Sequence, residues 1–220
     1  MVFPTDSGYK KTKRIKRGRA SLPEKFAPLA SWIADQFGCV APLNIVTDKT
    51  VNRIPRLQII FEYEADAEKF RSEDGFQFDE AKQQAVMEQF RATISRPRFF
   101  GLDHDRMFAI FSSFERAARE EANSAVRVDD IAAVRKWLGA SEVWEIKPLF
   151  DCVTFMFFTD EQIKESEDTG FRELCVKAYS SQLAYYDEFG YFEQRPIQAY
   201  FSSKETFERD YQGNWGDFFR

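Results

Sequence analysis

The sequence carries three short patterns twice, in the same order along the chain. The matched pairs are 72–76 (SEDGF) with 166–171 (SEDTGF), 96–97 (RP) with 195–196, and 111–113 (FSS) with 201–203. Their offsets stay between 90 and 99 residues. Self-similarity at a nearly fixed period is typical of a repeated supersecondary unit. We therefore predict an internal duplication, which constrains the fold more than any other feature of the chain.

Hydrophobic periodicity gives both copies the same order of elements, α-β-β-α-α-β-α. In the first copy we predict a helix between Ser21 and Gly38, strands over 43–47, 56–63 and 106–111, and helices over 64–71, 79–94 and 114–122. In the second copy we predict helices over 129–138, from Thr159, over 171–186 and 204–211, and strands over 142–147, 152–158 and 197–201. The chain therefore contains two similar mixed units of helices and strands.

The predicted fold class is α+β. Within each unit the first two strands form an antiparallel hairpin, and a helical crossover returns the third strand parallel to its neighbour. We expect two small mixed sheets, or one six-stranded sheet, with helices packed on them and a pseudo-twofold relation between the copies. The predicted segments are a basic arm (1–20), a first unit (21–122), a linker (123–128), and a second unit with a C-terminal tail (129–220). Because the linker is short, we expect the units to pack as one body.

Several local patterns predict particular side-chain environments. The continuously apolar run 152–158 (CVTFMFF) is typical of a central strand that is buried on both faces. Thr159 and Gln162 form a capping-box pattern, and the serines of both FSS patterns can cap the helices that follow them. On the helix 129–138, we place four residues together on one side: Ile131, Val134, Trp137 and Leu138.

Composition indicates an aromatic-rich core and a reducing compartment. Phenylalanine occurs 24 times. Cys39, Cys152 and Cys175 are an odd number without a CxxC pair, which does not fit a disulfide framework. No apolar run resembles a signal peptide or a membrane span, so we expect a cytoplasmic protein. Because the sequence lacks GxGxxG, P-loop, HExxH, GxSxG and EF-hand patterns, we expect no cofactor and no metal.

Charge is distributed unevenly along the chain. The basic arm places seven cations in ten residues: Lys10, Lys11, Lys13, Arg14, Lys16, Arg17 and Arg19. The other 24 basic residues stand against 36 acidic ones, so the rest of the chain carries a formal charge of −12. Such an arm can bind the phosphates of nucleic acid or an anionic membrane surface. The alternatives are a solvated tail, or an arm that lies on the protein's own acidic face.

The single histidine, His104, lies between Asp103 and Asp105. Flanking carboxylates can orient and charge an imidazole, or add ligands to a metal. However, adjacent residues on an extended segment point in opposite directions, and no second histidine is present to complete a zinc site. A polar loop tip is therefore the alternative. The loop belongs to nine residues that only the first copy has, and such unpaired segments are where a site can be added to a duplicated fold.

Two aromatic groups near the C-terminus are candidate binding residues. Trp215, Phe218 and Phe219 lie in a tail without a counterpart in the first copy, and they form either a contact patch or a tail folded onto the core. Tyr185 and Tyr186 belong to an aromatic-rich stretch that suits a pocket, a partner surface or a core.

Three functions are compatible with the sequence. The first is a non-catalytic binding protein whose acidic body attracts a basic protein partner, as an inhibitor or immunity-type protein does. The second is a small-molecule sensor or carrier with a pocket at the seam between the repeats. The third is an enzyme that uses the Asp103-His104-Asp105 loop. Nucleic acid enters these hypotheses only through the basic arm.

Overall fold

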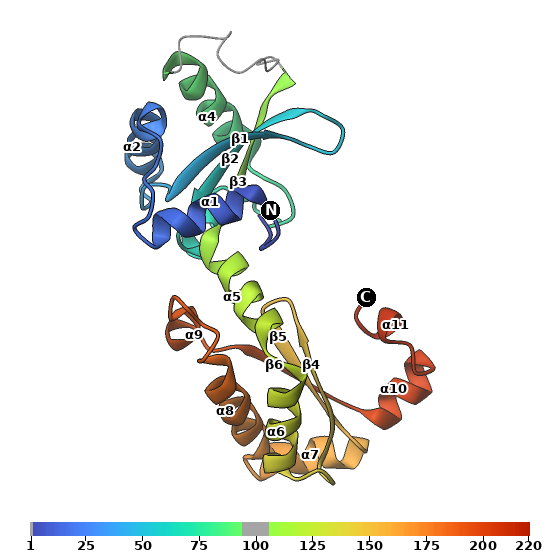
Figure 1. Ribbon diagram of the computed structural model, residues 1–220. Helices are drawn as coiled ribbons and strands as arrows, with labels where there is room; N and C mark the ends of the chain where they lie inside the picture. The colour runs from blue at the N-terminus through green and yellow to red at the C-terminus, as the bar shows by residue number, and fades with distance from the viewer. Residues whose placement is uncertain (1, 94–105) are drawn as a thin grey trace. The chain divides into compact units, whose positions relative to one another are not determined.

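A computed structural model describes residues 2–93 and 106–220 of the chain (Figure 1). The chain divides into two compact units, Met1–Ala117 and Ala118–Arg220, and the boundary falls inside one helix, α5. Each unit consists of helices packed on a small three-stranded mixed sheet, and the described residues form two such sheets. The predicted α+β class is therefore confirmed, with two sheets in place of a single six-stranded one.

In unit 1, a three-stranded sheet has the order β1-β2-β3, with β1 antiparallel and β3 parallel to β2. Its elements are α1 (Ser7–Lys16), η1 (Glu24–Phe26), α2 (Ala27–Phe37), β1 (Asn44–Lys49), β2 (Pro55–Phe61), α3 (Glu64–Glu68), α4 (Glu80–Thr93), β3 (Phe108–Ser113) and the start of α5 (Phe114–Ala125). The core is rich in phenylalanine: Phe70 stacks on Phe111 with ring centroids 4.2 Å apart.

In unit 2, the sheet has the order β4-β5-β6, again with one antiparallel and one parallel pair. After the end of α5, its elements are α6 (Val128–Leu138), β4 (Val143–Leu149), β5 (Cys152–Phe157), α7 (Asp160–Asp168), α8 (Phe171–Leu183), α9 (Tyr191–Gln194), β6 (Gln198–Ser203), α10 (Lys204–Tyr211) and α11 (Trp215–Phe218). The core side of β5 packs against Cys175 and Tyr179 of α8.

The two sheets share their register as well as their strand order. In the parallel pair of unit 1, Phe61 lies opposite Ser113, and in that of unit 2, Phe157 lies opposite Ser203. Both serines end the FSS patterns, so the repeated sequence occupies the same place in both sheets. We still infer the duplication, and the equal register supports that inference.

Several local predictions hold. β5 is the central strand of its sheet, and the five residues that follow Cys152 in it are buried. Thr159 Oγ1 accepts a hydrogen bond from the Gln162 amide at 3.2 Å, as the capping box predicts. Ser203 Oγ accepts from the Thr206 amide at 2.9 Å, and so caps α10.

The SEDGF pair does not adopt one conformation in both copies. Residues 72–75 form a turn before α4, whereas Ser166, Glu167 and Asp168 form the last turn of α7. The shared glycine is the part that is preserved: Gly75 and Gly170 have φ values of 74° and 73°, in the left-handed region that other residues rarely adopt.

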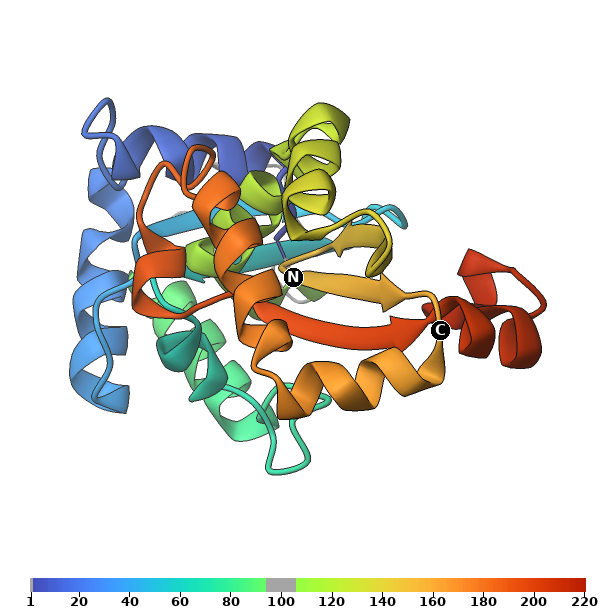
Figure 2. The same ribbon diagram turned by 90° about the horizontal axis from the view of Figure 1, so that it is seen from below.

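Each sheet also has a second face, opposite its crossover helices. In unit 1, α1 covers this face: a Cβ added to Gly8 would lie 3.0 Å from Gln58 Oε1 and 3.8 Å from Ile60 Cδ1. Gln58 and Ile60 alternate along β2 with the core residues Leu57 and Ile59. Figure 2 shows α1 and α4 on opposite sides of this sheet.

Asn123 on α5 is the main polar anchor inside unit 2. Its side chain is 1% exposed. Its Nδ2 donates to the carbonyls of Phe150 and Cys152 at 3.0 and 2.8 Å, and its Oδ1 accepts from the Tyr179 hydroxyl at 2.7 Å. The Asn123 side-chain amide thus connects α5 to the β4–β5 turn and to α8. The sequence had predicted that Asn123 begins a linker between the units, whereas it lies within α5.

Replacing Asn123 with alanine should destabilise unit 2 by about 2–4 kcal/mol, because the buried Tyr179 hydroxyl and two carbonyls lose their partner. Urea unfolding followed by tryptophan fluorescence measures this loss. Asn52→Ala, at an exposed position, is the matched control and should stay within about 0.5 kcal/mol of the parent. Equal stabilities for the two variants would contradict the anchoring role.

Candidate functional site

The basic arm forms a helix, α1, which packs on the sheet of unit 1. Tyr9 and Thr12 are buried on its inner side. Tyr9 stacks on Phe114 with ring centroids 5.2 Å apart, and Thr12 Oγ1 accepts a hydrogen bond from Asn44 Nδ2 at 3.0 Å. This segment is therefore not a solvated tail.

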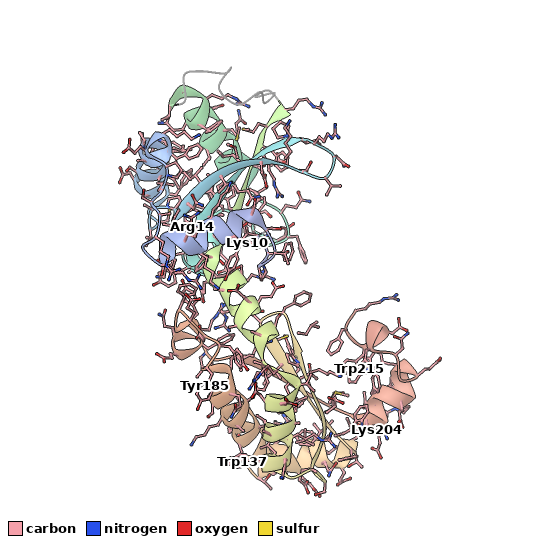
Figure 3. All side chains as sticks on the ribbon, in the orientation of Figure 1. Lys10, Arg14, Trp137, Tyr185, Lys204 and Trp215 are labelled. Atoms are coloured by element: carbon pink, nitrogen blue, oxygen red, sulfur yellow. The ribbon has the colours of Figure 1, made fainter. Side chains whose placement is uncertain are left out.

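The cations of the arm divide between the two sides of α1. Lys16 forms an ion pair with Glu62, so part of the arm does pair with the protein's own acids. Lys13 lies over the ring of Tyr9, with its Nζ 5.8 Å from the ring centroid. The exposed cations are Lys10, Lys11, Arg14, Arg17 and Arg19, and Figure 3 shows Lys10 and Arg14 along the same helix.

A cavity of about 330 Å³ lies beside α1. Its lining includes Lys11 and Arg14 from α1, Lys25 from η1, and Asn44 and Thr47 from the edge strand β1. Among the described residues that line it, none carries a carboxylate. We call this concave surface the cationic cavity.

In unit 2, α6 and α8 enclose an apolar groove of about 580 Å³. It is lined by Ala133, Val134, Trp137, Leu174, Lys177, Ala178, Ser181 and Gln182. Trp137 is 65% exposed and Leu174 38% exposed. Of the residues predicted to share one side of this helix, Val134 and Leu138 are buried and Ile131 packs against the core, whereas Trp137 is exposed in the groove.

Tyr185 and Tyr186 do not share a pocket. Tyr185, at the end of α8, is 84% exposed (Figure 3). It continues the outward stripe of α8 that runs through Leu174, Ala178 and Ser181 at helical spacing. The Tyr186 hydroxyl accepts from Arg127 Nε at 3.1 Å and donates to Asp130, so this residue ties α8 to the start of α6. α6 and α8 therefore run antiparallel along the groove.

The C-terminal tail folds back on unit 2 as part of an aromatic cluster. Trp215 stacks on Trp144 of β4 and lies against Phe207 of α10, with ring centroids 6.0 and 4.2 Å away. Phe218 and Phe219 contact Trp215 and each other. Lys147 Nζ lies 4.9 Å from the centroid of the Trp215 ring. Sequence reasoning had named three of these rings, and Trp144 and Phe207 complete the cluster.

A second cavity of unit 2, of about 380 Å³, lies between this tail and the sheet. It is lined by Leu149, Cys152, Thr154, Tyr200, Phe201, Ser202, Thr206, Tyr211, Phe218 and Phe219. Burial and the nearby Asp151 raise the pKa of the Cys152 thiol, and its Sγ donates to the Leu149 carbonyl at 3.0 Å. Cys152 is therefore a protonated lining residue.

A polar cluster recurs at the carboxyl ends of the parallel strands. In unit 2, Asp160 accepts hydrogen bonds from Ser203, Thr206 and Arg209, and its amide donates to Glu205 at 2.9 Å. In unit 1, Glu64 accepts from Ser113, and its amide donates to Glu115 at 2.9 Å. Each cluster joins the N-termini of two helices. We therefore assign these carboxylates to helix capping.

The Asp160 cluster should make stability depend on pH. Hydrogen bonds from Arg209, Ser203 and Thr206 lower the pKa of Asp160 to about 2, so its contribution is present above about pH 4 and is lost as pH falls towards 2. Asp160→Asn should lower stability at pH 7 by up to about 1 kcal/mol, since the group is partly exposed.

The measurement is thermal unfolding of both proteins at pH 7 and pH 2. At pH 2 the parent and the Asp160→Asn variant should converge. Glu161→Gln removes a charge at the neighbouring exposed position and serves as the control. A stability gap for Asp160→Asn that is unchanged at pH 2 would refute the assignment.

The predicted Asp103-His104-Asp105 site lies outside the described residues, as does the Arg-Pro pair at 96–97. Within the described ranges, no group of three or more His, Cys, Asp or Glu side chains is arranged to hold a metal. Burial raises the pKa of the Cys175 thiol to about 12.

None of the helices in residues 2–93 and 106–220 combines the length and apolar character that crossing a bilayer requires. Comparison of the chain with protein-family models, with curated proteins and with solved structures gives no match. The candidate sites are thus the cationic cavity, the apolar groove, and the cavity beneath the aromatic cluster.

Proposed function

We propose that this chain is a non-catalytic binding protein whose unit 2 docks a cationic, amphipathic helix of a partner protein. The apolar groove between α6 and α8 is the observation that carries this proposal. Partner helices lie in such grooves through apolar residues spaced three or four apart, and Trp is among the commonest residues to dominate an interface. From Leu174 to Ser181 the outward residues of α8 that line the groove span about 10 Å, which matches two turns of a bound helix.

The exposed tryptophan at position 137 has no aromatic counterpart in the first copy. Gly38 ends α2 and Gly139 ends α6, both with positive φ. Counting back from these glycines, Trp137 occupies the position of Gln36, which is also exposed. The fold therefore does not require an apolar residue here, and an exposed Trp on a protein surface suggests a contact.

The net charge of unit 2 as a whole favours a cationic occupant, although Lys177, the charged residue in the described lining of the groove, is itself a cation. Unit 2 contains 12 Lys and Arg against 20 Asp and Glu, a formal charge of −8, whereas unit 1 contains 19 against 16, a charge of +3. The acidity expected of the whole body is thus concentrated in unit 2. Two acidic residues belong to the Trp137 end of the groove. Glu173 directly precedes the lining residue Leu174, and Glu142 follows the end of α6, where its amide donates to the Gly139 carbonyl at 3.0 Å.

The test uses a synthetic helical peptide of about 16 residues with leucines on one face and lysines on the other. It should bind the full chain with micromolar affinity, and Trp137→Gln should weaken binding at least tenfold, because a central Trp dominates such interfaces. Fluorescence anisotropy of the labelled peptide measures both.

Two controls separate groove binding from general stickiness. Phe76→Gln removes an aromatic residue that is 87% exposed in unit 1, and it should leave the affinity unchanged. A peptide with glutamates in place of the lysines should bind at least tenfold more weakly. Equal binding by Trp137→Gln, or by the glutamate peptide, would overturn the proposal.

A small-molecule carrier is the second candidate function, supported by the cavity beneath the aromatic cluster. The cavity combines the aromatic rings of Tyr211, Phe218 and Phe219 with the hydroxyls of Thr154 and Ser202, a mixture typical of ligand pockets. This cavity supports a carrier function for unit 2, whereas a pocket at the seam stays a prediction from the sequence.

A panel of small aromatic compounds such as indole should raise the melting temperature of the parent by several degrees if the cavity binds ligands. Leu149→Trp, which fills part of the cavity, should abolish the shift. Compounds that stabilise both proteins equally would rule this cavity out. We further propose a cytoplasmic location, which three unpaired cysteines favour.

A further inference from the structure

The cationic cavity of unit 1 brings cations from two separate elements to one concavity. Lys11 and Arg14 are three residues apart on α1, so they lie on one side of the helix. Lys25 reaches the same cavity from η1. Tyr9 and Thr12 hold α1 in place by burial, so the two helical cations are positioned by a docked element.

These cations are available for a ligand. No described residue forms an ion pair with Lys10, Lys11, Arg14 or Arg19. Lys25 lies over the ring of Phe26, with its Nζ 4.9 Å from the ring centroid. The local surface is therefore positive although the whole chain is acidic.

The remaining lining suits phosphate oxygens. Ser21, Asn44 and Thr47 add hydroxyl and amide groups to the wall, and β1 is an edge strand whose outer side has no strand partner among the described residues. Asn44 is already committed, since its Nδ2 donates to Thr12 and its Oδ1 accepts from the Ile45 amide. Lys11 and Arg14 are thus the principal donors to a ligand.

The outward side of α1 distinguishes a polymer from a membrane. Lys10, Arg14 and Arg17 follow one another at i, i+4 and i+7, so a stripe of cations about 10 Å long continues from the cavity. Among the described residues, the exposed positions of α1 include no apolar side chain, whereas a helix that binds a bilayer inserts an apolar face. The aromatic Tyr9 is buried against Phe114.

We propose that the cationic cavity and the exposed stripe of α1 bind the phosphate backbone of a nucleic acid. The contacts are ionic and the lining offers no exposed aromatic platform, so binding is independent of base sequence and steeply dependent on salt. This site is independent of the apolar groove of unit 2, and it takes a ligand of the opposite charge.

The experiment measures anisotropy of fluorescein-labelled, mixed-sequence nucleic acids of about 20 nucleotides, one single-stranded and one duplex, between 50 and 200 mM salt. Four phosphate contacts predict a log–log salt slope of about −3 to −4. The double variant Lys11→Glu/Arg14→Glu should weaken binding at least tenfold and reduce the slope by about two.

The matched control is Lys49→Glu/Arg53→Glu, which changes the net charge equally at exposed positions around the β1–β2 turn. It should change the affinity less than about threefold. A second double variant, Lys11→Gln/Arg14→Gln, guards against misfolding, and circular dichroism melting should match the parent for every variant. An equal loss in the control would overturn the proposal, because it would assign binding to net charge alone.

A third arm uses phosphatidylcholine vesicles containing about 20% phosphatidylserine. Nucleic acid should bind and the vesicles should not sediment the protein. Vesicle binding without nucleic-acid binding would overturn the proposal and assign α1 to a membrane surface. Absence of binding in every arm at 50 mM salt would equally overturn it.

Discussion

One parallel strand pair closes each sheet, β2 with β3 in unit 1 and β5 with β6 in unit 2, and the remaining elements are arranged around that pair. Parallel neighbours require a long crossover, whose helices must cover one face of the sheet. Here α3 and α4, or α7 and α8, supply that cover. The capping serines Ser113 and Ser203 occupy the same register position in the two pairs. In each unit the third strand therefore leads directly into a further helix, α5 or α10. A three-stranded sheet built in this way always has a second face that its own crossover cannot reach.

That second face explains why the unrepeated ends of the chain carry two of the three candidate sites, the cationic cavity and the cavity beneath the aromatic cluster. In unit 1 the face is covered by α1, which precedes the repeat, and Gly8 allows the helix to approach Gln58 and Ile60 closely. In unit 2 the tail contributes Trp215, which packs on Trp144 of β4 and leaves a cavity beneath it. The same requirement, burial of one sheet face, is thus met by a cationic helix in one unit and by an aromatic tail in the other.

The sequence predicts those parts of the fold that depend on local patterns. β5 is recognisable because a strand buried on both faces is apolar at nearly every position. The caps at Thr159 and Ser203 are recognisable because each needs only its own side chain and the backbone amide three residues later. α1 was missed as a helix because tertiary burial of Tyr9 and Thr12 holds it on the sheet, and its apolar content is too low for a periodic signal. The exposure of Trp137 could not be predicted, because periodicity groups the apolar residues of α6 on one side but does not say which of them the core covers.

Because the two units differ in charge, their candidate sites select ligands of opposite charge. A polyanion that approaches the cationic cavity is attracted by unit 1 and repelled by the formal charge of −8 on unit 2. A cationic helix experiences the reverse, because Lys10, Lys11 and Arg14 repel it while unit 2 attracts it. Each unit therefore rejects the other's ligand by like charge, which provides specificity without any additional contact. Since both effects act through exposed charges, salt weakens them together, whereas the contacts of Trp137 within the apolar groove do not depend on ionic strength.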